Sequence, residues 1–161
     1  MNSESQPVPA LDSGAPINPG AEPWVHRGRD LDSVEEIREM VRRQYADLTQ
    51  DQLLKQYFDL GPGFTDWKAH LATVADYWCH VLLGAPDYEV DTLENHRKLH
   101  ERVAFTPELF DRWLEIFHDA VNGGWSGPSA DRANKRATGM AWAMAQRYLC
   151  HGVWRPESRR T

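Results

Sequence analysis

Between Ser33 and Tyr148 the apolar residues recur every three or four positions, and no segment alternates apolar and polar residues convincingly with a period of two. A spacing of three and four places side chains on one face of an α-helix, whereas a half-buried strand needs the period of two. The sequence therefore predicts an all-α fold with four long helices and two short ones. It contains no internal repeat.

Capping residues mark where these helices begin and end. Ser33 and Glu36 are spaced as a capping box at the start of the first helix. A second pair of the same kind, Thr49 with Gln52, predicts that a separate short helix opens there. Thr65 or Asp66 marks the start of a helix that runs to about Leu83, and Gly84 marks its end. A short helix is expected from Thr92. Thr106-Pro107 begins a long helix that Gly123-Gly124 ends, and a last helix begins at Ser129.

Residues 1–31 differ from the rest of the chain. Five of the ten prolines fall there, separated by small and polar residues with little to bury, which predicts a disordered N-terminal tail. Residues 32–152 are expected to form the folded domain, followed by a short C-terminal tail at 153–161. With 161 residues, of which 41% are hydrophobic, the chain is long enough for one domain with a substantial core.

Charge and cysteine content argue against several classes of function. The formal net charge of -6 disfavours binding to nucleic acid or to an anionic membrane surface, because both draw on basic patches. No apolar run is long enough to span a bilayer, and the N-terminus lacks a signal-peptide core. Two cysteines, Cys79 and Cys150, are too few for a disulfide framework. These features predict a cytoplasmic protein.

The most informative polar residues lie on apolar helix faces. His70 and His96 belong to two different predicted helices. A flat apolar cofactor between those helices would have one histidine on each side, and a neutral imidazole can ligate haem iron. Tyr45, His70 and Trp113 carry O–H and N–H donors, which need a partner when they are buried. The pattern is therefore compatible with a haem pocket that has donors facing the iron.

Two other interpretations of these residues stay open. A histidine, tyrosine or tryptophan on an apolar face is commonly a packing residue, so the chain also suits a helical protein without a cofactor. His96 and His100 are four residues apart, face the same way on a helix, and would chelate zinc together with Glu94 and His118. The zinc pattern has low specificity, because the carboxylate-rich spacing of the known zinc proteases is missing.

A set of motifs in a fixed order carries a resemblance to a known family. The motifs are Asp66-Trp67-Lys68-Ala69-His70, Tyr77-Trp78, Leu82-Leu83-Gly84, Asp87-Tyr88, His96-Arg97-Lys98-Leu99 and Phe110-Asp111-Arg112-Trp113-Leu114-Glu115-Ile116-Phe117. In this order and spacing, the chain resembles the group III truncated haemoglobins over residues 34–148. The resemblance implies a two-over-two helical sandwich around haem b, so that residues 32–152 would be a truncated globin domain.

The resemblance also implies roles for individual residues. His96 corresponds to the iron ligand on the proximal side of haem, while Tyr45, His70 and Trp113 correspond to the residues that stabilise a bound ligand on the distal side. Aromatic residues expected around the haem are Phe58, Tyr77, Trp78, Phe110 and Phe117.

The identity of the iron ligand has one alternative. The stretch between His96 and Trp113 is longer than in compact members of the family, and an alignment backward from Trp113 favours His100 as the ligand. We expect His96, because its distance from Tyr88 and the His-x-x-Leu pattern both point to it.

The resemblance implies binding of O2 and other small ligands, namely NO, CO or peroxide. A strongly polar distal side favours oxygen activation over simple delivery, which predicts slow O2 release and NO dioxygenation or peroxidase-like chemistry with a separate, unidentified reductase. Two alternatives remain, a haem-based sensor or interaction module whose tail contacts a partner, and a cofactor-free helical binding protein.

Overall fold

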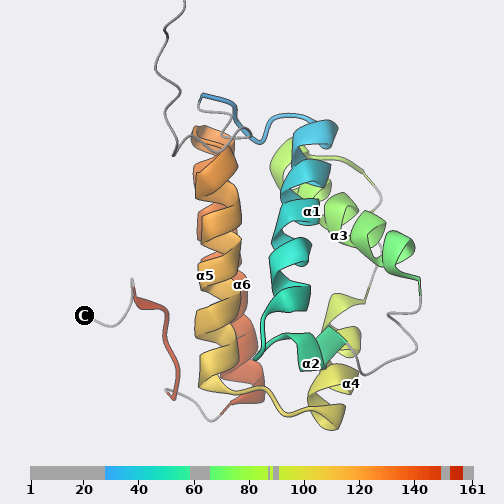
Figure 1. Cartoon of the computed structure of the whole chain (residues 1–161), viewed down its shortest axis with the longest axis vertical. Helices are drawn as coiled ribbons and strands as arrows, with labels where there is room; N and C mark the ends of the chain where they lie inside the picture. Colours follow the sequence, from blue (N-terminus) through green and yellow to red (C-terminus); the bar gives the residue numbers. More distant parts are fainter. Residues whose placement is uncertain (1–27, 59–65, 87, 89–90, 150–152, 158–161) are drawn as a thin grey trace, which may run out of the picture.

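The computed structural model describes residues 28–58, 66–86, 88, 91–149 and 153–157, and all regular structure in them is helical (Figure 1). The helices are α1 (Val34–Gln50), α2 (Lys55–Phe58), α3 (Trp67–Leu83), α4 (Thr92–Arg102), α5 (Pro107–Gly124) and α6 (Pro128–Tyr148). The prediction of four long helices and two short ones is confirmed. Residues 1–27 of the expected tail and the expected break at Gly61-Pro62-Gly63 lie outside the described residues. In the described part of the chain, no helix combines the length and the apolar character needed to cross a membrane.

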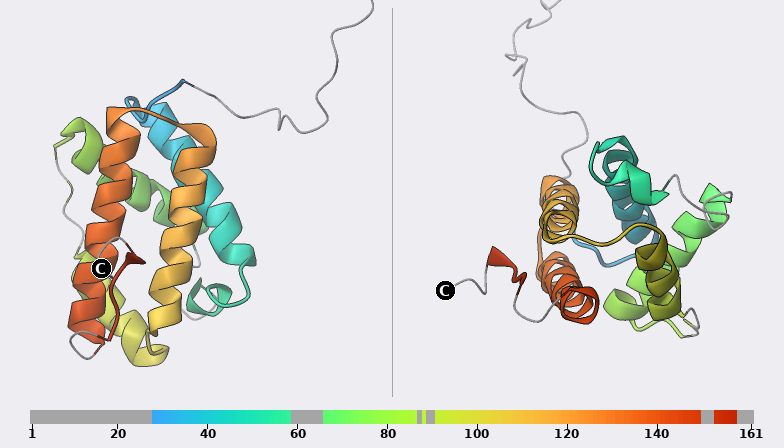
Figure 2. Two further views of the ribbon diagram at one scale, coloured as in Figure 1. Left: turned by 90° about the vertical axis from the view of Figure 1, so that its left-hand side faces the viewer. Right: turned by 90° about the horizontal axis from the view of Figure 1, so that it is seen from below.

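The long helices form two pairs that lie against each other (Figures 1 and 2). Helix α1 packs on α3, and α5 packs on α6 after a short connection at 125–127. Contacts of α1 with α5 and of α3 with α6 join the pairs. Each helix turns its apolar stripe inward, so one core is shared by all four. This is the two-over-two arrangement that the family resemblance implies.

Small residues on α6 allow the α5–α6 pair to pack closely. Ala133, Ala137, Ala141 and Ala145 recur every four residues along one face of α6, and each is at most 3% exposed. Side chains of this size let a neighbouring helix approach closely, while larger buried residues on the other helices fill the core. The bulky fully buried side chains include Ile37, Met40, Leu48, Phe117 and Val121.

Local signals account for most helix ends. The side chains of Ser33, Asp66 and Thr106 each accept a backbone N–H in the first turn of α1, α3 and α5. Pro107 follows at the start of α5, where its missing N–H costs little. Gly84 ends α3 with a φ of 69°, a left-handed conformation that glycine adopts without steric penalty. These four ends agree with the predicted boundaries.

One predicted boundary is wrong. Thr49 does not open a new helix, because α1 continues past it and the Thr49 hydroxyl donates to the carbonyl of Tyr45 at 2.9 Å. Helix α1 ends at its C-cap Asp51, whose carboxylate accepts the N–H groups of Leu53 and Leu54 at 3.0 and 3.1 Å in the turn before α2. A threonine hydroxyl inside a helix can bond to the carbonyl four residues earlier, so a capping-box spacing alone did not identify the cap here.

The contacts of the domain begin inside the stretch that was expected to be a tail. Leu31 is fully buried, and Asp30 accepts the N–H groups of Ser129 and Ala130 at 2.9 and 2.8 Å in the first turn of α6. The N-cap of α6 is Gly127, which has no side chain to accept these bonds. Partial burial would raise the pKa of Asp30, but its backbone hydrogen bonds hold that pKa below the usual value.

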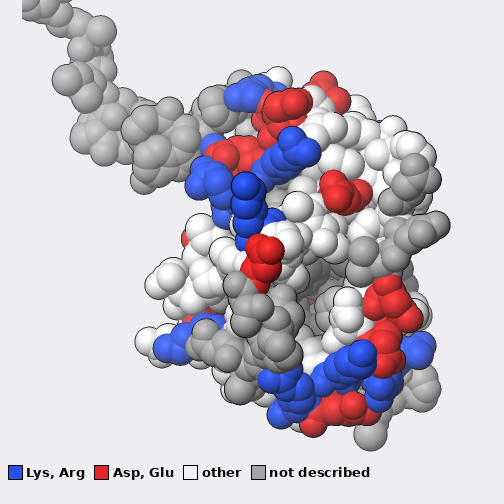
Figure 3. Space-filling view, turned by 90° about the vertical axis from the view of Figure 1, so that its right-hand side faces the viewer, with Lys and Arg blue, Asp and Glu red and all other residues white. Residues whose placement is uncertain are grey.

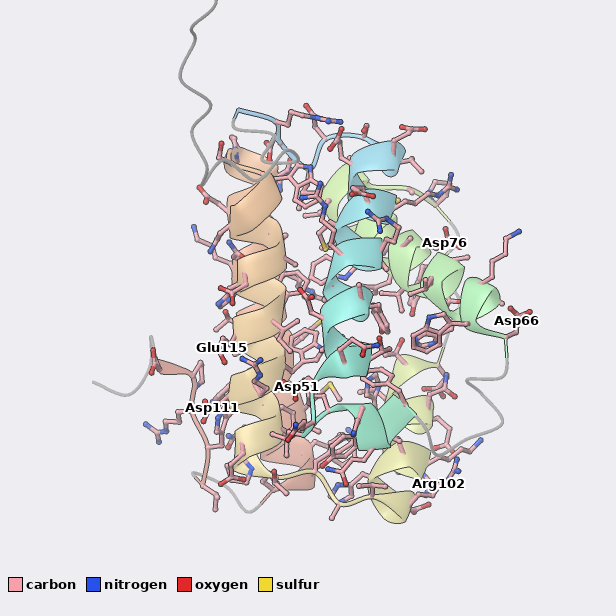
Figure 4. The ribbon with its side chains drawn as sticks, viewed as in Figure 1. Asp51, Asp66, Asp76, Arg102, Asp111 and Glu115 are labelled. Carbon is pink, nitrogen blue, oxygen red and sulfur yellow. The ribbon has the colours of Figure 1, made fainter. Side chains whose placement is uncertain are left out.

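Trp154 anchors the segment that follows α6. Its side chain is 3% exposed, its ring packs on Phe110 with 5.3 Å between ring centroids, and its indole N–H donates to Asp111 at 2.9 Å. Asp111 lies on α5 (Figure 4). One large aromatic residue therefore holds residues 153–157 against the domain, although this segment was expected to be a tail.

Helix α4 is set apart from the rest of the body. None of its residues is buried, and it takes no part in the extensive helix–helix packing of the described residues. Leu93 on this helix is 51% exposed. A helix with an apolar face normally buries that face against another element. Figure 3 shows that the surface is hollowed between α3 and α4, so the inner side of α4 borders an open space.

Candidate functional site

Tyr45 and His70 are brought together by the packing of α1 on α3. The Tyr45 hydroxyl lies 3.2 Å from Nε2 of His70, within hydrogen-bond distance. Trp67 lies one turn before His70 on α3 and stacks on its imidazole, with 5.6 Å between the centroids and 19° between the planes. Phe58 and Trp67 also meet the Tyr45 ring edge to face, at 5.7 and 5.8 Å. The polar pair is thus held inside an aromatic cluster.

Burial keeps both members of this pair neutral near pH 7. It raises the pKa of the Tyr45 hydroxyl well above its usual value, with a further contribution from Tyr88. Burial also lowers the pKa of His70, and His96 adds to the lowering. A neutral phenol and a neutral imidazole both carry hydrogen-bond donors. Because one of the two groups donates to the other, the pair keeps one donor for a ligand and places no charge in the site.

His96, on α4, has the form that a metal ligand needs. Its Nδ1 lies 2.6 Å from the carbonyl oxygen of Thr92, and since a carbonyl only accepts, Nδ1 carries the proton. Burial lowers the pKa of His96, and this effect outweighs the opposing effect of the Thr92 hydrogen bond. The imidazole is therefore neutral with its Nε2 lone pair unprotonated. A backbone acceptor that fixes the tautomer in this way is typical of histidines that ligate a metal.

His70 and His96 are electrostatic neighbours across the space between α3 and α4. They sit on separate helices, and a charge on His96 would disfavour a charge on His70. One histidine is bonded to a buried phenol, while Nε2 of the other has no hydrogen-bond partner within the described residues. The structure thus places the two predicted histidines around one region of the molecule.

Trp113 does not join the Tyr45–His70 cluster through any contact seen among the described residues. Its ring stacks on Phe117 at 5.5 Å and 22°, and Phe117 stacks in turn on Trp78 at 4.9 Å and 29°. Within the part of the chain that the structure describes, its indole N–H has no hydrogen-bond partner. Trp113 is therefore a half-buried donor at the edge of the core on α5.

The other aromatic residues expected around haem fall into two groups. Trp78, Phe110 and Phe117 are at most 3% exposed, so their rings belong to the packed core. Phe58 and Tyr77 are half-buried and keep surface that a ligand would cover. The Tyr77 hydroxyl donates to the Met140 sulfur at 2.7 Å and accepts from Arg136 at 3.0 Å.

His100 has the tautomer opposite to that of His96. The backbone N–H of Phe105 donates to Nδ1 of His100 at 2.9 Å, so in the neutral ring Nε2 carries the proton. A protonated Nε2 has no lone pair for a metal, and Nδ1 is already engaged. In the described residues, no three His, Cys, Asp or Glu side chains come together as a metal site, so the zinc set with His100, Glu94 and His118 is not formed.

Sequence reasoning missed the part that Trp67 plays beside His70. The signal was available, because positions three apart on a helix share a face and Trp67 and His70 have that spacing. The role of Tyr88 was harder to foresee. Its hydroxyl shares a hydrogen bond with the Thr92 hydroxyl at 2.8 Å, which depends on how the chain enters α4.

We expect acid to destabilise the chain through His70. The pKa of His70 is lowered in the folded state, so between that value and the ordinary value of about 6.5 the unfolded state binds more protons. The free energy of unfolding should therefore fall as the pH falls below about 6.5, and it should be insensitive to His70 above that pH. Urea unfolding across this range measures the slope, which should be shallower in His70→Leu. Equal slopes in the two proteins would contradict the expectation.

Comparison with known proteins agrees with the fold and with the family resemblance. No protein-family model matches the chain. It is 31% identical over 90 residues to the group 3 truncated hemoglobin ctb of Campylobacter jejuni, a match that covers 55% of this chain and 68% of that protein. The crystal structure of a group III truncated hemoglobin from Campylobacter jejuni superposes with a TM-score of 0.66 at 26% identity. That match covers 74% of this chain and 94% of the other. The chain belongs to the group III truncated haemoglobins.

Proposed function

We propose that the chain binds haem between α3 and α4, with His96 as the iron ligand, and holds O2 or another diatomic ligand beside Tyr45 and His70. The observation that carries the proposal is the pair of histidines. His96 has Nδ1 fixed and Nε2 free, and His70 near it is bonded to a buried hydroxyl. One imidazole is thus prepared to bind a metal and the other to bind a ligand.

The packing around α4 supports this placement. A flat apolar group on the inner side of α4 would cover a helix face against which no other helix packs extensively within the described residues. Apolar side chains that are only partly buried would also be covered, and they come from α3, α4, α5 and α6. Among them are Leu71, Val74, Tyr77, Leu99, Trp113 and Met144.

Haem, when bound, supplies iron with one position open to O2, NO or CO. The residues of the chain set how long a ligand stays. The hydrogen bond between Tyr45 and His70 uses one of their two donors, so the pair offers the remaining O–H or ring N–H, and we include the Trp113 indole N–H as a second donor. Hydrogen bonds from these groups would slow the release of O2. Haem b is the form we propose, as the family resemblance implies.

A polar distal side with several donors favours the conversion of a ligand over its simple delivery. We therefore propose NO dioxygenation or a peroxidase-like reaction as the activity. Either reaction would take electrons from a separate reductase, a partner that we leave unidentified. The buried Cys79 thiol, whose pKa is raised by burial, fits a reducing compartment such as the cytoplasm.

Absorption spectroscopy tests the proposed function directly. The purified full chain is titrated with haem, and spectra are recorded in the oxidised state, after reduction, and after addition of CO. We expect saturable uptake of one haem per chain and a spectrum that shifts with CO. A folded, helical protein that takes up no haem would show that the chain is a binding or scaffold protein instead.

A further inference from the structure

Helix α4 is held by a small number of specific contacts, since none of its residues is buried and no helix packs extensively along it in the described chain. At its end, the Phe105 N–H donates to Nδ1 of His100 at 2.9 Å and so closes the turn that leads into α5. This bond uses the lone pair that would make His100 a competing metal ligand. The same residue therefore shapes the chain after α4.

Tyr148, in the last turn of α6, contacts α4 at both ends. Its hydroxyl donates to the carbonyl of Leu93 at 3.1 Å, in the first turn of α4. Its ring lies 5.1 Å from the His100 imidazole, near the other end of the helix. The carbonyl of Leu93 belongs to the body of the helix, so this bond fixes the position of the backbone and not only of a side chain.

Phe105 links these contacts to the core. It is 5% exposed, and its ring lies 5.0 Å from His100, 5.2 Å from Tyr148 and 6.5 Å from His96. His100, Phe105 and Tyr148 thus form one aromatic cluster on the side of α4 that faces α6 (hereafter the clamp). It lies next to His96, and none of its three residues bonds to Nε2 of His96.

We propose that the clamp positions α4 and, through it, His96. His100 and Tyr148 are positioning residues in this proposal, and His100 is not an alternative ligand. The clamp itself is a property of the chain without a cofactor. Its consequence at iron rests on the proposed function, because it would set how closely His96 approaches the metal.

Hydrogen exchange on the full chain tests the clamp, with and without haem. Tyr148→Phe removes only the hydroxyl, and His100→Leu removes the acceptor for Phe105. We expect the amides of residues 95–102 to exchange roughly fivefold to tenfold faster in both variants, as befits the loss of one hydrogen bond. His100→Asn keeps an acceptor near the position of Nδ1 and should restore slow exchange.

A matched control distinguishes a local effect of the clamp on α4 from a general destabilisation of the domain. His118→Leu removes an imidazole on α5 that bonds to Thr138, far along the chain from α4, and it should leave α4 exchange unchanged. Wild-type exchange of α4 in both Tyr148→Phe and His100→Leu would overturn the proposal. Acceleration spread equally over α4, α5 and α6 would overturn it as well.

The haem-loaded protein gives a second measurement. The iron–histidine stretching frequency of the reduced protein should shift in Tyr148→Phe and in His100→Leu, and His100→Asn should return it toward the wild-type value. Loss of the iron–histidine band in His100→Leu, with His96 intact, would identify His100 as the ligand and overturn the proposal. If the wild-type chain takes up no haem, the proposed function is wrong. Hydrogen exchange on the haem-free chain then still tests whether the clamp positions α4.

Discussion

Replacing His96 with alanine is expected to abolish stable haem binding, with haem lost at least about 100-fold faster than from the unchanged chain. Changes to residues that merely support a metal ligand already lower metal affinity by roughly tenfold to 100-fold, so loss of the ligand itself should exceed that range. His96 is the imidazole whose Nδ1 is fixed by Thr92 and whose Nε2 is free. No other histidine in the described chain combines these features with a place on the inner side of α4.

The measurement is the rate at which haem transfers from each protein to an excess of a high-affinity acceptor, followed by absorbance. His100→Ala is the matched control, since it removes an imidazole four residues away whose Nδ1 is engaged by Phe105. It should keep its haem spectrum, and added imidazole should partly restore a six-coordinate or five-coordinate spectrum in His96→Ala. A haem spectrum that is lost only in His100→Ala would show that the ligand assignment is wrong.

Tyr45→Phe is expected to speed O2 dissociation by about tenfold to 100-fold. A hydrogen bond to a polar or charged acceptor inside a protein contributes about 1.5–3 kcal/mol, and each 1.4 kcal/mol corresponds to about tenfold in an equilibrium or a rate. The substitution removes one oxygen atom and keeps the ring that Phe58, Trp67 and His70 contact. The change should therefore report the hydroxyl and not the packing of α1 on α3.

Stopped-flow displacement of O2 measures this rate. Dissociation of CO serves as the control, because CO accepts hydrogen bonds poorly and should leave at nearly the same rate from both proteins. An unchanged O2 rate would show that the Tyr45 hydroxyl serves His70 alone. A parallel rise in both rates would point to an opened pocket in place of a lost hydrogen bond.

The sequence was most informative where the physical cause is local. Ser33, Asp66, Thr106 and Gly84 mark helix ends because a cap or a left-handed residue acts within one turn of its own position. The apolar periodicity likewise predicted which faces are buried. Thr49 shows the limit of such signals, since its hydroxyl donates to the Tyr45 carbonyl inside α1 and does not cap a new helix.

The geometry of the site could not be predicted from apolar periodicity, because it depends on contacts between helices that are distant in the sequence. Tyr45 and His70 are 25 positions apart, and their hydrogen bond exists only because α1 packs on α3. Only the motif resemblance had placed them on one side of haem. His96 and His100 share a face of α4, so spacing could not separate them. Their tautomers distinguish the two histidines. The tautomer of His96 is set by the carbonyl of Thr92, and that of His100 by the N–H of Phe105, which lies beyond the end of the helix.

The cap that Asp30 provides has a consequence for the order of folding. The residue lies 99 positions before Ser129, so the first turn of α6 gains its acceptor only when the two ends of the domain meet. On a ribosome, Asp30 emerges well before α6, and a nascent chain that stops before α6 leaves this carboxylate without these partners. Contacts of such long sequence separation raise the contact order and slow folding. The domain is therefore expected to close as a single cooperative event only after α6 has been synthesised.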